Sequence, residues 1–142
     1  MLKKIIFASV ASFALLSYAQ AAPTDEANAH FNAIASGDVA TVMQQYAAQP
    51  MLELVGGPLN GTYVGADKVH EVWAKFAKAN SGLKVKVDNV AESTNQLGAT
   101  VTANVVFQGQ NTIKVRYVLT FRDGKISTEI WQIDPKLVTA AY

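Results

Sequence analysis

The sequence predicts an α+β fold in which three N-terminal helices pack on a strongly curved, mainly antiparallel sheet. Apolar residues recur at helical spacing in the first half of the chain, and they alternate with polar residues over four later segments. Turn-forming residues separate these segments. Because only one face of each later strand is apolar, we expect the helices to cover that face.

An export signal is predicted ahead of this domain. Two lysines precede the apolar run Ile5–Leu16, and Ala19-Gln20-Ala21 fits a small-x-small cleavage site. A membrane anchor is the alternative, but a spanning helix needs about 20 apolar residues and this run is shorter. We therefore predict that residues 1–21 are removed. Residues 22–142 would then form one periplasmic or secreted domain that no longer contacts a membrane.

The composition of the predicted mature chain excludes several classes of protein. The full chain has 12 basic and 11 acidic residues, so the loss of Lys3 and Lys4 leaves a net charge of −1. No nucleic-acid partner is expected, because such partners need a basic surface. The absence of cysteine excludes disulfides and thiolate catalysis. Two histidines without cysteine predict no metal site, and no motif predicts a cofactor.

The first predicted helix begins at Thr24, an N-cap residue that is followed by acidic residues in the first turn. Gly37 is expected to end it. One face of this helix carries residues at spacings of three and four, namely Ala27, His30, Phe31 and Ile34.

Asp38 is expected to cap a second helix that ends at Pro50. Its predicted buried residues are Val39, Val42, Met43 and Tyr46. A short strand follows at Met51–Val55, and Gly56–Gly61 reads as a turn-rich loop at a pocket rim. The third predicted helix runs from Gly65 to about Asn80 and buries Val69, Val72, Trp73 and Phe76.

Four antiparallel strands complete the predicted domain. They cover Leu83–Val90, Ala99–Gln108, Ile113–Arg122 and Ile126–Ile133. Asp123-Gly124 predicts a two-residue hairpin between the last two. The face expected to point away from the helices carries five cations, namely Lys84, Lys86, Lys114, Arg116 and Arg122.

Three short segments make the chain resemble the nuclear transport factor 2-like superfamily, which includes ketosteroid isomerases and SnoaL-like polyketide cyclases. These are Ser36-Gly37-Asp38, Leu59-Asn60-Gly61 with Gly65, and Phe121–Ile126. The resemblance covers about residues 24–134 and implies a cone-shaped domain whose open end takes a small molecule. It does not fix the activity, because one fold hosts many functions.

Ketosteroid isomerases use an Asp general base and an oxyanion hole of one Tyr and one protonated Asp. By resemblance, the Tyr position falls on His30, the base position on Leu54, and the oxyanion Asp on Val118. A shift in the last hairpin would move that third position to Arg116, Tyr117 or Leu119. All three groups are changed, so the chain is not expected to be a ketosteroid isomerase. The resemblance also turns three last-strand residues toward the pocket, namely Glu129, Trp131 and Ile133.

His30 and Glu129 are the candidate catalytic residues. His30 lies on an otherwise apolar helix face, where it is either a packed histidine with one hydrogen bond or a functional one. If Glu129 shares the inward parity of Trp131, desolvation suits its carboxyl group to acid–base work. If Ile126 and Ile130 are the buried set instead, Glu129 is solvated. Facing inward, the two candidates would form a hydrogen-bonded pair.

The expected ligand-binding residues are mostly apolar. They are Phe31, Tyr46, Leu54, Val72, Trp73, Val101, Ala103, Val105, Val118 and Trp131. Glu53 is a further polar candidate, but the alternation of its strand does not decide which face is buried.

These residues support three hypotheses of function. The first is an exported protein that binds a small, mostly apolar ligand without turnover. The second is an isomerase, dehydratase or cyclase that uses His30 and Glu129 for proton transfer. The third is a non-catalytic module that acts through the outer sheet face. The resemblance also makes a homodimer through that face plausible.

Overall fold

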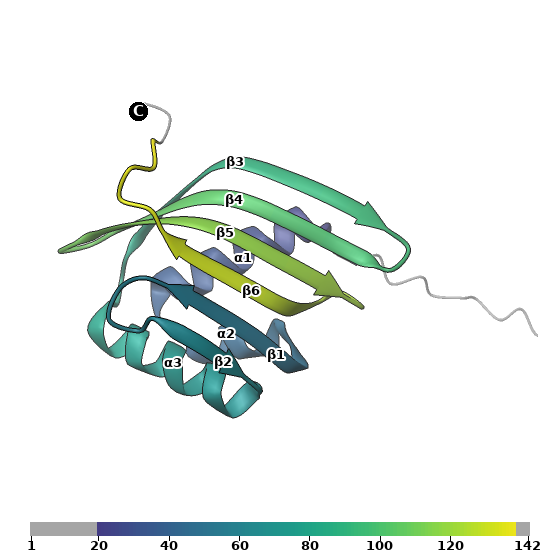
Figure 1. The fold of residues 1–142 in the computed structure, drawn as a ribbon, viewed down its shortest axis with the longest axis horizontal. Coiled ribbons are helices and arrows are strands. Elements are labelled where there is room, and N and C mark those ends of the chain that lie inside the picture. Colours follow the sequence, from purple (N-terminus) through teal and green to yellow (C-terminus); the bar gives the residue numbers. More distant parts are fainter. Residues whose placement is uncertain (1–19, 139–142) are drawn as a thin grey trace, which may run out of the picture.

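Three helices cover one face of a six-stranded sheet in the computed structural model, which describes residues 20–138 (Figure 1). The helices are α1 (Pro23–Ser36), α2 (Val39–Gln44) and α3 (Ala66–Ala79). Most of the predicted export signal, residues 1–19, lies outside the described residues. Within residues 20–138, no helix is both long enough and apolar enough to cross a bilayer.

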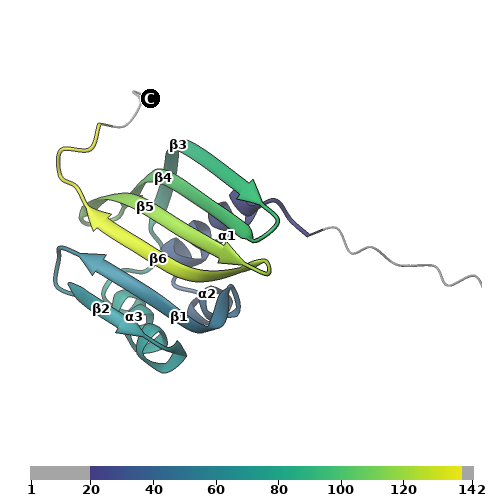
Figure 2. The ribbon, with the colours of Figure 1, turned by 45° about the vertical axis from the view of Figure 1, so that its right-hand side comes forward.

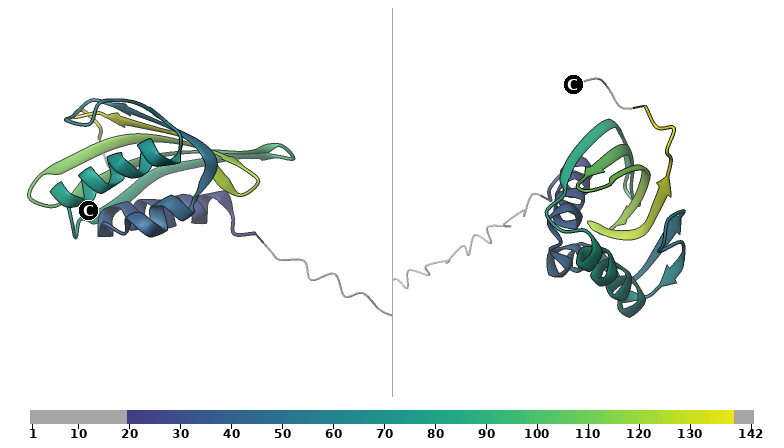
Figure 3. Two further views of the ribbon diagram at one scale, coloured as in Figure 1. Left: turned by 90° about the horizontal axis from the view of Figure 1, so that it is seen from below. Right: turned by 90° about the vertical axis from the view of Figure 1, so that its left-hand side faces the viewer.

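The sheet is mostly antiparallel and has the order β2-β1-β6-β5-β4-β3 (Figure 2). Its strands are β1 (Tyr46–Val55), β2 (Gly61–Val64), β3 (Lys84–Asn95), β4 (Gly98–Gln108), β5 (Thr112–Arg122) and β6 (Lys125–Ile133). The last four form the predicted antiparallel series, and Asp123-Gly124 forms the predicted hairpin. Among the six described strands, only β1 and β6 pair in parallel. Both views of Figure 3 show the helices on the same side of the sheet.

The prediction for the second helix is confirmed at its start and wrong beyond Gln44. Asp38 caps α2, because its Oδ1 accepts a hydrogen bond of 3.1 Å from the backbone N–H of Thr41. Tyr46, however, is the first residue of β1, and Pro50 lies inside that strand, where the register with β6 shifts. Pairing with β6 outweighs the helix propensity of the intervening alanines. This change turns Tyr46 from a helix residue into a sheet residue.

Two smaller differences concern Thr24 and β2. The helix α1 begins one residue earlier than predicted, with Pro23 in its first turn, a position that proline favours. Thr24 makes no cap, and its N–H and Oγ1 instead donate to Glu92 Oε2 at 3.1 and 2.6 Å. No strand was predicted at the four residues of β2, of which only Gly61 belonged to the predicted loop, but they pair with β1 as an edge strand.

An aromatic cluster fills the space between the helices and the sheet. The Trp131 ring stacks on Phe107 with a centroid distance of 5.3 Å and an interplanar angle of 11°. Trp73, Phe76 and Tyr117 lie around it at 5.7, 5.4 and 5.4 Å. Such tilted and stacked pairs add to the gain from burial. Trp131 therefore packs against four other aromatic rings in the interior.

Candidate functional site

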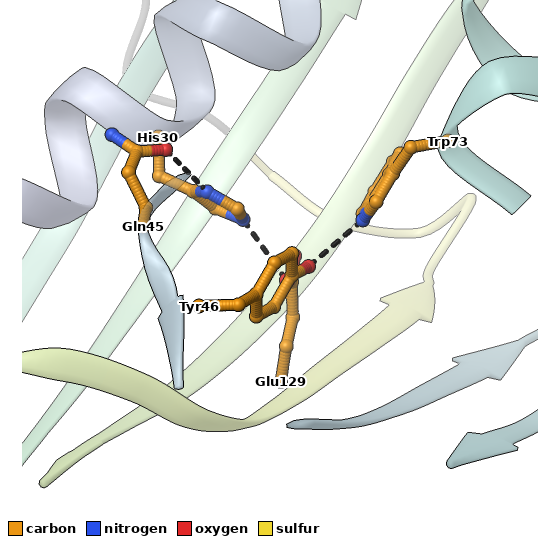
Figure 4. A network of polar contacts seen from close by, with 5 residues as sticks. All are labelled: His30, Gln45, Tyr46, Trp73 and Glu129. Atoms are coloured by element: carbon orange, nitrogen blue, oxygen red, sulfur yellow. Dashed lines mark hydrogen bonds and ion pairs between the residues drawn. The ribbon is translucent and has the colours of Figure 1, made fainter. Parts of the chain in front are cut away.

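A buried polar network joins α1, α3, β6 and the start of β1 (Figure 4). His30 Nε2 lies 2.9 Å from Glu129 Oε2, and His30 Nδ1 lies 2.8 Å from Gln45 Oε1. The exposed fraction of both His30 and Glu129 is 0%. Glu129 therefore faces inward, and the structure brings the two candidate catalytic residues into contact.

Tyr46 and Trp73 complete this buried polar network. The Tyr46 hydroxyl donates a hydrogen bond to Glu129 Oε2, and it accepts one of 2.8 Å from Trp73 Nε1–H. Helical spacing predicted Tyr46 on a helix, and no pattern in the sequence predicted a role for Gln45. Both become neighbours of the pair because α2 ends at Gln44 and the chain turns into β1.

The apolar neighbours of His30 and Glu129 explain why the two side chains need each other. Glu129 lies between Leu52 of β1 and Leu119 of β5 in the sheet, and both leucines are fully buried. His30 shares the buried face of α1 with Phe31. A charge buried among such residues is tolerated only when it is paired and hydrogen-bonded.

The protonation states follow from burial and from the Glu129 carboxylate. Burial lowers the pKa of His30, but the charge and hydrogen bond of Glu129, with the hydrogen bond of Gln45, raise it more, so the pKa stands above its ordinary value. Burial, then the charge of Glu129, raises the pKa of Tyr46 well above its ordinary value. The raised pKa favours the protonated form of His30, in which both ring nitrogens donate, one to Glu129 and one to Gln45, beside a protonated Tyr46.

Tyr117 lies next to this network without joining it. In the sheet Tyr117 pairs with Trp131. This pair lies two residues along each strand from the Leu119–Glu129 pair, and therefore on the same face of the sheet. The Tyr117 hydroxyl and Glu129 Oε1 are buried and have no hydrogen-bond partner among residues 20–138. Burial, then the charge of Glu129, raises the pKa of Tyr117 well above its ordinary value.

Val118 does not lie in the site. Along β5, Tyr117 and Leu119 are buried, whereas Arg116 is exposed and Val118 is half-buried between Thr102 and Ile130 on the opposite face. The alternation of a strand sends neighbours to opposite faces, so Val118 cannot line a space between sheet and helices. Of the four positions considered for the oxyanion group, only Tyr117 and Leu119 face inward, and neither is a carboxylic acid.

A separate apolar cavity of about 340 Å³ opens between the β1–β2 loop, the C-terminal half of α3 and the ends of β5 and β6. Neither His30 nor Glu129 lines it. Its lining comprises Leu54, Gly56, Gly57, Pro58, Leu59, Trp73, Lys75, Phe76, Ala79, Asn80, Asn111, Ile113, Trp131 and Ile133. Trp73 belongs to both sites, because its ring borders the cavity and its Nε1–H enters the network.

Three of the ten expected ligand-binding residues line this cavity, namely Leu54, Trp73 and Trp131. Five others are buried in the hydrophobic core away from it, namely Phe31, Val72, Val101, Ala103 and Val105. Sequence periodicity identified seven of these eight inward-facing positions, those on α1, α3, β4 and β6, without showing which end of the interior is open. The Gly56-Gly57 turn does lie at the rim, as its glycines suggested.

The remaining polar candidate, Glu53, points away from the interior. Glu53 faces the opposite side of β1 from Leu54, and its Oε2 accepts a 2.7 Å hydrogen bond from Thr62. Among residues 20–138, no group of three or more His, Asp and Glu side chains is arranged to hold a metal ion.

Four of the five cations of the outer sheet face, Lys86, Lys114, Arg116 and Arg122, have partners within the domain. Arg116 Nε lies 2.8 Å from Asp134 Oδ2, and Lys114 Nζ donates to the backbone oxygen of Leu137 at 3.2 Å. Arg122 donates to a backbone oxygen of the β3–β4 turn. The segment that follows β6 therefore already contacts part of the face that the third hypothesis would use.

The layer of three helices on a mostly antiparallel sheet places the chain in the class of domains with a nuclear transport factor 2-like fold. Within that class, the chain belongs to the family of SnoaL-like domains, whose sequence pattern matches residues 27–129. Among proteins with curated descriptions, none matches the chain significantly.

Solved structures share the fold at low sequence identity. A protein of unknown function with a cystatin-like fold from Nostoc punctiforme has a TM-score of 0.64 at 15% identity, covering 80% of this chain and 90% of that one. A ketosteroid isomerase-like protein from Erwinia carotovora atroseptica has a TM-score of 0.63 at 15% identity, covering 78% and 92%. A Burkholderia xenovorans NTF-2 like protein of unknown function has a TM-score of 0.58 at 13% identity, covering 82% and 86%.

Proposed function

We propose that this chain is an exported SnoaL-like protein that binds a small, mostly apolar ligand in the apolar cavity without turning it over. The observation that carries this proposal is the separation of the two sites. The cavity is bordered by Trp73, Phe76 and Trp131, while the ionisable pair of His30 and Glu129 is fully buried and does not line it. A ligand in the cavity would therefore meet aromatic surfaces rather than an acid or a base.

The size and lining of the cavity support a small ligand. Its volume of about 340 Å³ lies at the lower end of the range of ligand pockets, about 300–1,000 Å³. Three aromatic rings offer a large area for contact at a low cost in conformational entropy. The proposal of export rests on the basic, apolar and small-residue pattern of residues 1–21.

The neutral fluorescent probe N-phenyl-1-naphthylamine tests binding in the cavity. We expect it to bind the wild-type protein with a rise in probe emission. It should also quench tryptophan emission, because both tryptophans of the chain border the cavity. Ile133→Phe should fill the cavity and weaken binding by about tenfold or more, the effect of about 1.4 kcal/mol of lost contact.

Gln132→Phe is the matched control, since it adds the same ring to the neighbouring, exposed position of β6. Its affinity for the probe should equal that of the wild type. Equal binding by Ile133→Phe would contradict the proposed site. Export is checked independently by the mass of the protein recovered from the periplasm, which should correspond to a chain that begins at Ala22.

A second candidate function is proton transfer, which the 2.9 Å contact between His30 and Glu129 favours. Glu129 is fully buried and does not line the cavity, so a substrate could reach it only after the packing around it rearranges. Exchange of the α-hydrogens of 1-tetralone in deuterated water, followed by NMR, tests this function. An acceleration that disappears in Glu129→Gln would support it, and no acceleration by the wild type would count against it.

A further inference from the structure

The rim of the apolar cavity carries a single charged side chain among its lining residues. That residue is Lys75 on α3, and the other polar lining side chains outside the aromatic rings are the amides of Asn80 and Asn111. Among residues 20–138, no acidic side chain lines the cavity. A ligand that fills the cavity would therefore meet apolar surface inside and the Lys75 side chain at the rim, where a change of partner would bring its ammonium group to the ligand.

Lys75 is held only weakly where it is. Its Nζ lies 3.2 Å from Glu71 Oε1, one turn earlier on α3, with the two side chains 61% and 56% exposed. Exposed pairs of this kind contribute little to stability, so a change of partner is cheap. The flexible stem of lysine also lets the ammonium group move while its methylene groups lie along apolar surface.

The end of α3 does not oppose an anion as strongly as a bare helix C-terminus would. The last carbonyl groups of a helix carry partial negative charge. The Phe76 carbonyl accepts hydrogen bonds from both the backbone N–H and the side-chain amide of Asn80, at 2.8 and 3.3 Å. Lys75, one residue before Phe76, adds a full positive charge at the same end.

We propose that the ligand is a small aromatic carboxylate, with its ring beside Trp73, Phe76 and Trp131 and its carboxylate at Lys75. This inference rests on the proposed function, because it names the class of ligand for the same cavity. The cavity volume of about 340 Å³ fits a body of one or two fused rings. A planar ring matches the aromatic border, and a carboxylate matches the one charge at the rim.

Calorimetric titration of two probes of the same shape tests the proposal. The probes are 2-naphthoate and its neutral analogue 2-naphthamide. The wild-type protein should bind the carboxylate about three- to fivefold more tightly than the amide, as expected for one partly exposed ion pair. High salt should reduce this preference. Lys75→Met should lower the affinity for 2-naphthoate by the same factor and leave that for 2-naphthamide unchanged.

Lys78→Met is the matched control, because Lys78 lies on the same helix but does not line the cavity. Its affinities should equal those of the wild type. Equal binding of both probes, or a loss in Lys78→Met as large as in Lys75→Met, would overturn the carboxylate preference while the apolar cavity stands. If neither probe binds and N-phenyl-1-naphthylamine also fails to bind, the proposed function falls with it.

Discussion

The buried polar network and the apolar cavity share the Trp73 ring, but their chemistry is opposite. In the network, His30, Glu129 and Tyr46 are sealed from solvent, and nearly every polar atom has a partner. In the cavity, aromatic and aliphatic surfaces surround open space. We infer that the buried ionisable groups fix the packing of the interior, and that the cavity inside its rim is lined by residues without acid–base chemistry.

The two regions should therefore respond differently to substitution. The network joins α1, α3, β6 and the start of β1, so a lost partner leaves a buried polar group unpaired. The cavity is bordered by side chains that already face empty space, so a small change there can be absorbed. The largest losses of stability are expected in the network and the smallest at the cavity rim.

Glu129→Ala should produce the largest effect. It leaves the His30 imidazole and the Tyr46 hydroxyl without their shared acceptor in a fully buried position. Breaking a buried ion pair from one side costs about 3–5 kcal/mol of the free energy of unfolding. Urea denaturation followed by tryptophan fluorescence measures this loss.

The double variant His30→Leu/Glu129→Leu separates the charge from the packing. Replacement of a buried pair by apolar residues is often neutral or stabilising, so the double variant should recover most of the stability lost in Glu129→Ala. A loss below about 1 kcal/mol in the single variant would show that the pair is not the buried ionic contact described above.

Tyr46→Phe should have a smaller effect. The change removes a hydroxyl that donates to Glu129 and accepts from Trp73, and the expected loss is about 1–3 kcal/mol. Tyr117→Phe is the matched control, since the Tyr117 hydroxyl is buried without a partner among residues 20–138. The control should be neutral or slightly stabilising in the same urea assay. Equal losses in the two variants would mean that ring packing, rather than the hydrogen bonds, sets the effect.

The fold could be predicted largely from the sequence because periodicity reports burial directly. The inward alternation of β4 and β5, the buried face of α1 and the Asp123-Gly124 turn are all short-range features. Tyr46 and Pro50 were misplaced because parallel pairing of β1 with β6 is a long-range contact. No local preference of the alanines between them reveals it.

The candidate pair of His30 and Glu129 could be predicted from the sequence. The separation of this buried pair from the apolar cavity could not. His30 and Glu129 were found because each is a polar residue at an apolar position, and the family resemblance supported both. Whether they face open space depends on how the Trp131 and Trp73 rings pack, which no spacing encodes. The β1–β2 loop was predicted as a turn at a pocket rim, but which of its residues line the cavity could not be predicted, since a loop shows no periodicity.

Gly57→Ala tests how well the cavity rim absorbs a change. Gly57 has a φ of 75°, and an added Cβ would lie 2.8 Å from Ile133 Cδ1. Gly82→Ala is the control, because it has a φ of 65° with no atom within 4 Å of the added Cβ. Both substitutions carry backbone strain of about 1–3 kcal/mol.

The difference between the two alanine variants isolates the steric contact. We expect it to stay below about 1 kcal/mol, because Ile133 can rotate its terminal methyl into the cavity. The affinity for N-phenyl-1-naphthylamine should nevertheless fall in Gly57→Ala and not in Gly82→Ala. An excess loss of more than about 2 kcal/mol would show that the rim is packed as tightly as the core.

A change of pH should affect the network and leave the cavity unchanged. Because the pKa of His30 is raised in the folded state, its stabilisation is fully present below the ordinary value of 6.5. It is lost as the pH rises through the higher folded-state pKa. Four carboxyl groups have lowered pKa values and lose their contributions only in acid, namely Asp38, Glu71, Glu92 and Asp134.

Unfolding in urea at a series of pH values upward from 6.5 should therefore show a falling free energy for the wild type, and a flatter profile for His30→Gln. This loss should be smaller than that in Glu129→Ala, because the pair stays in place while its proton leaves. N-phenyl-1-naphthylamine has no group that titrates in this range, so its affinity should stay constant. A parallel fall in stability and probe affinity would mean that Trp73 couples the network to the cavity. The two regions would then not respond independently to pH.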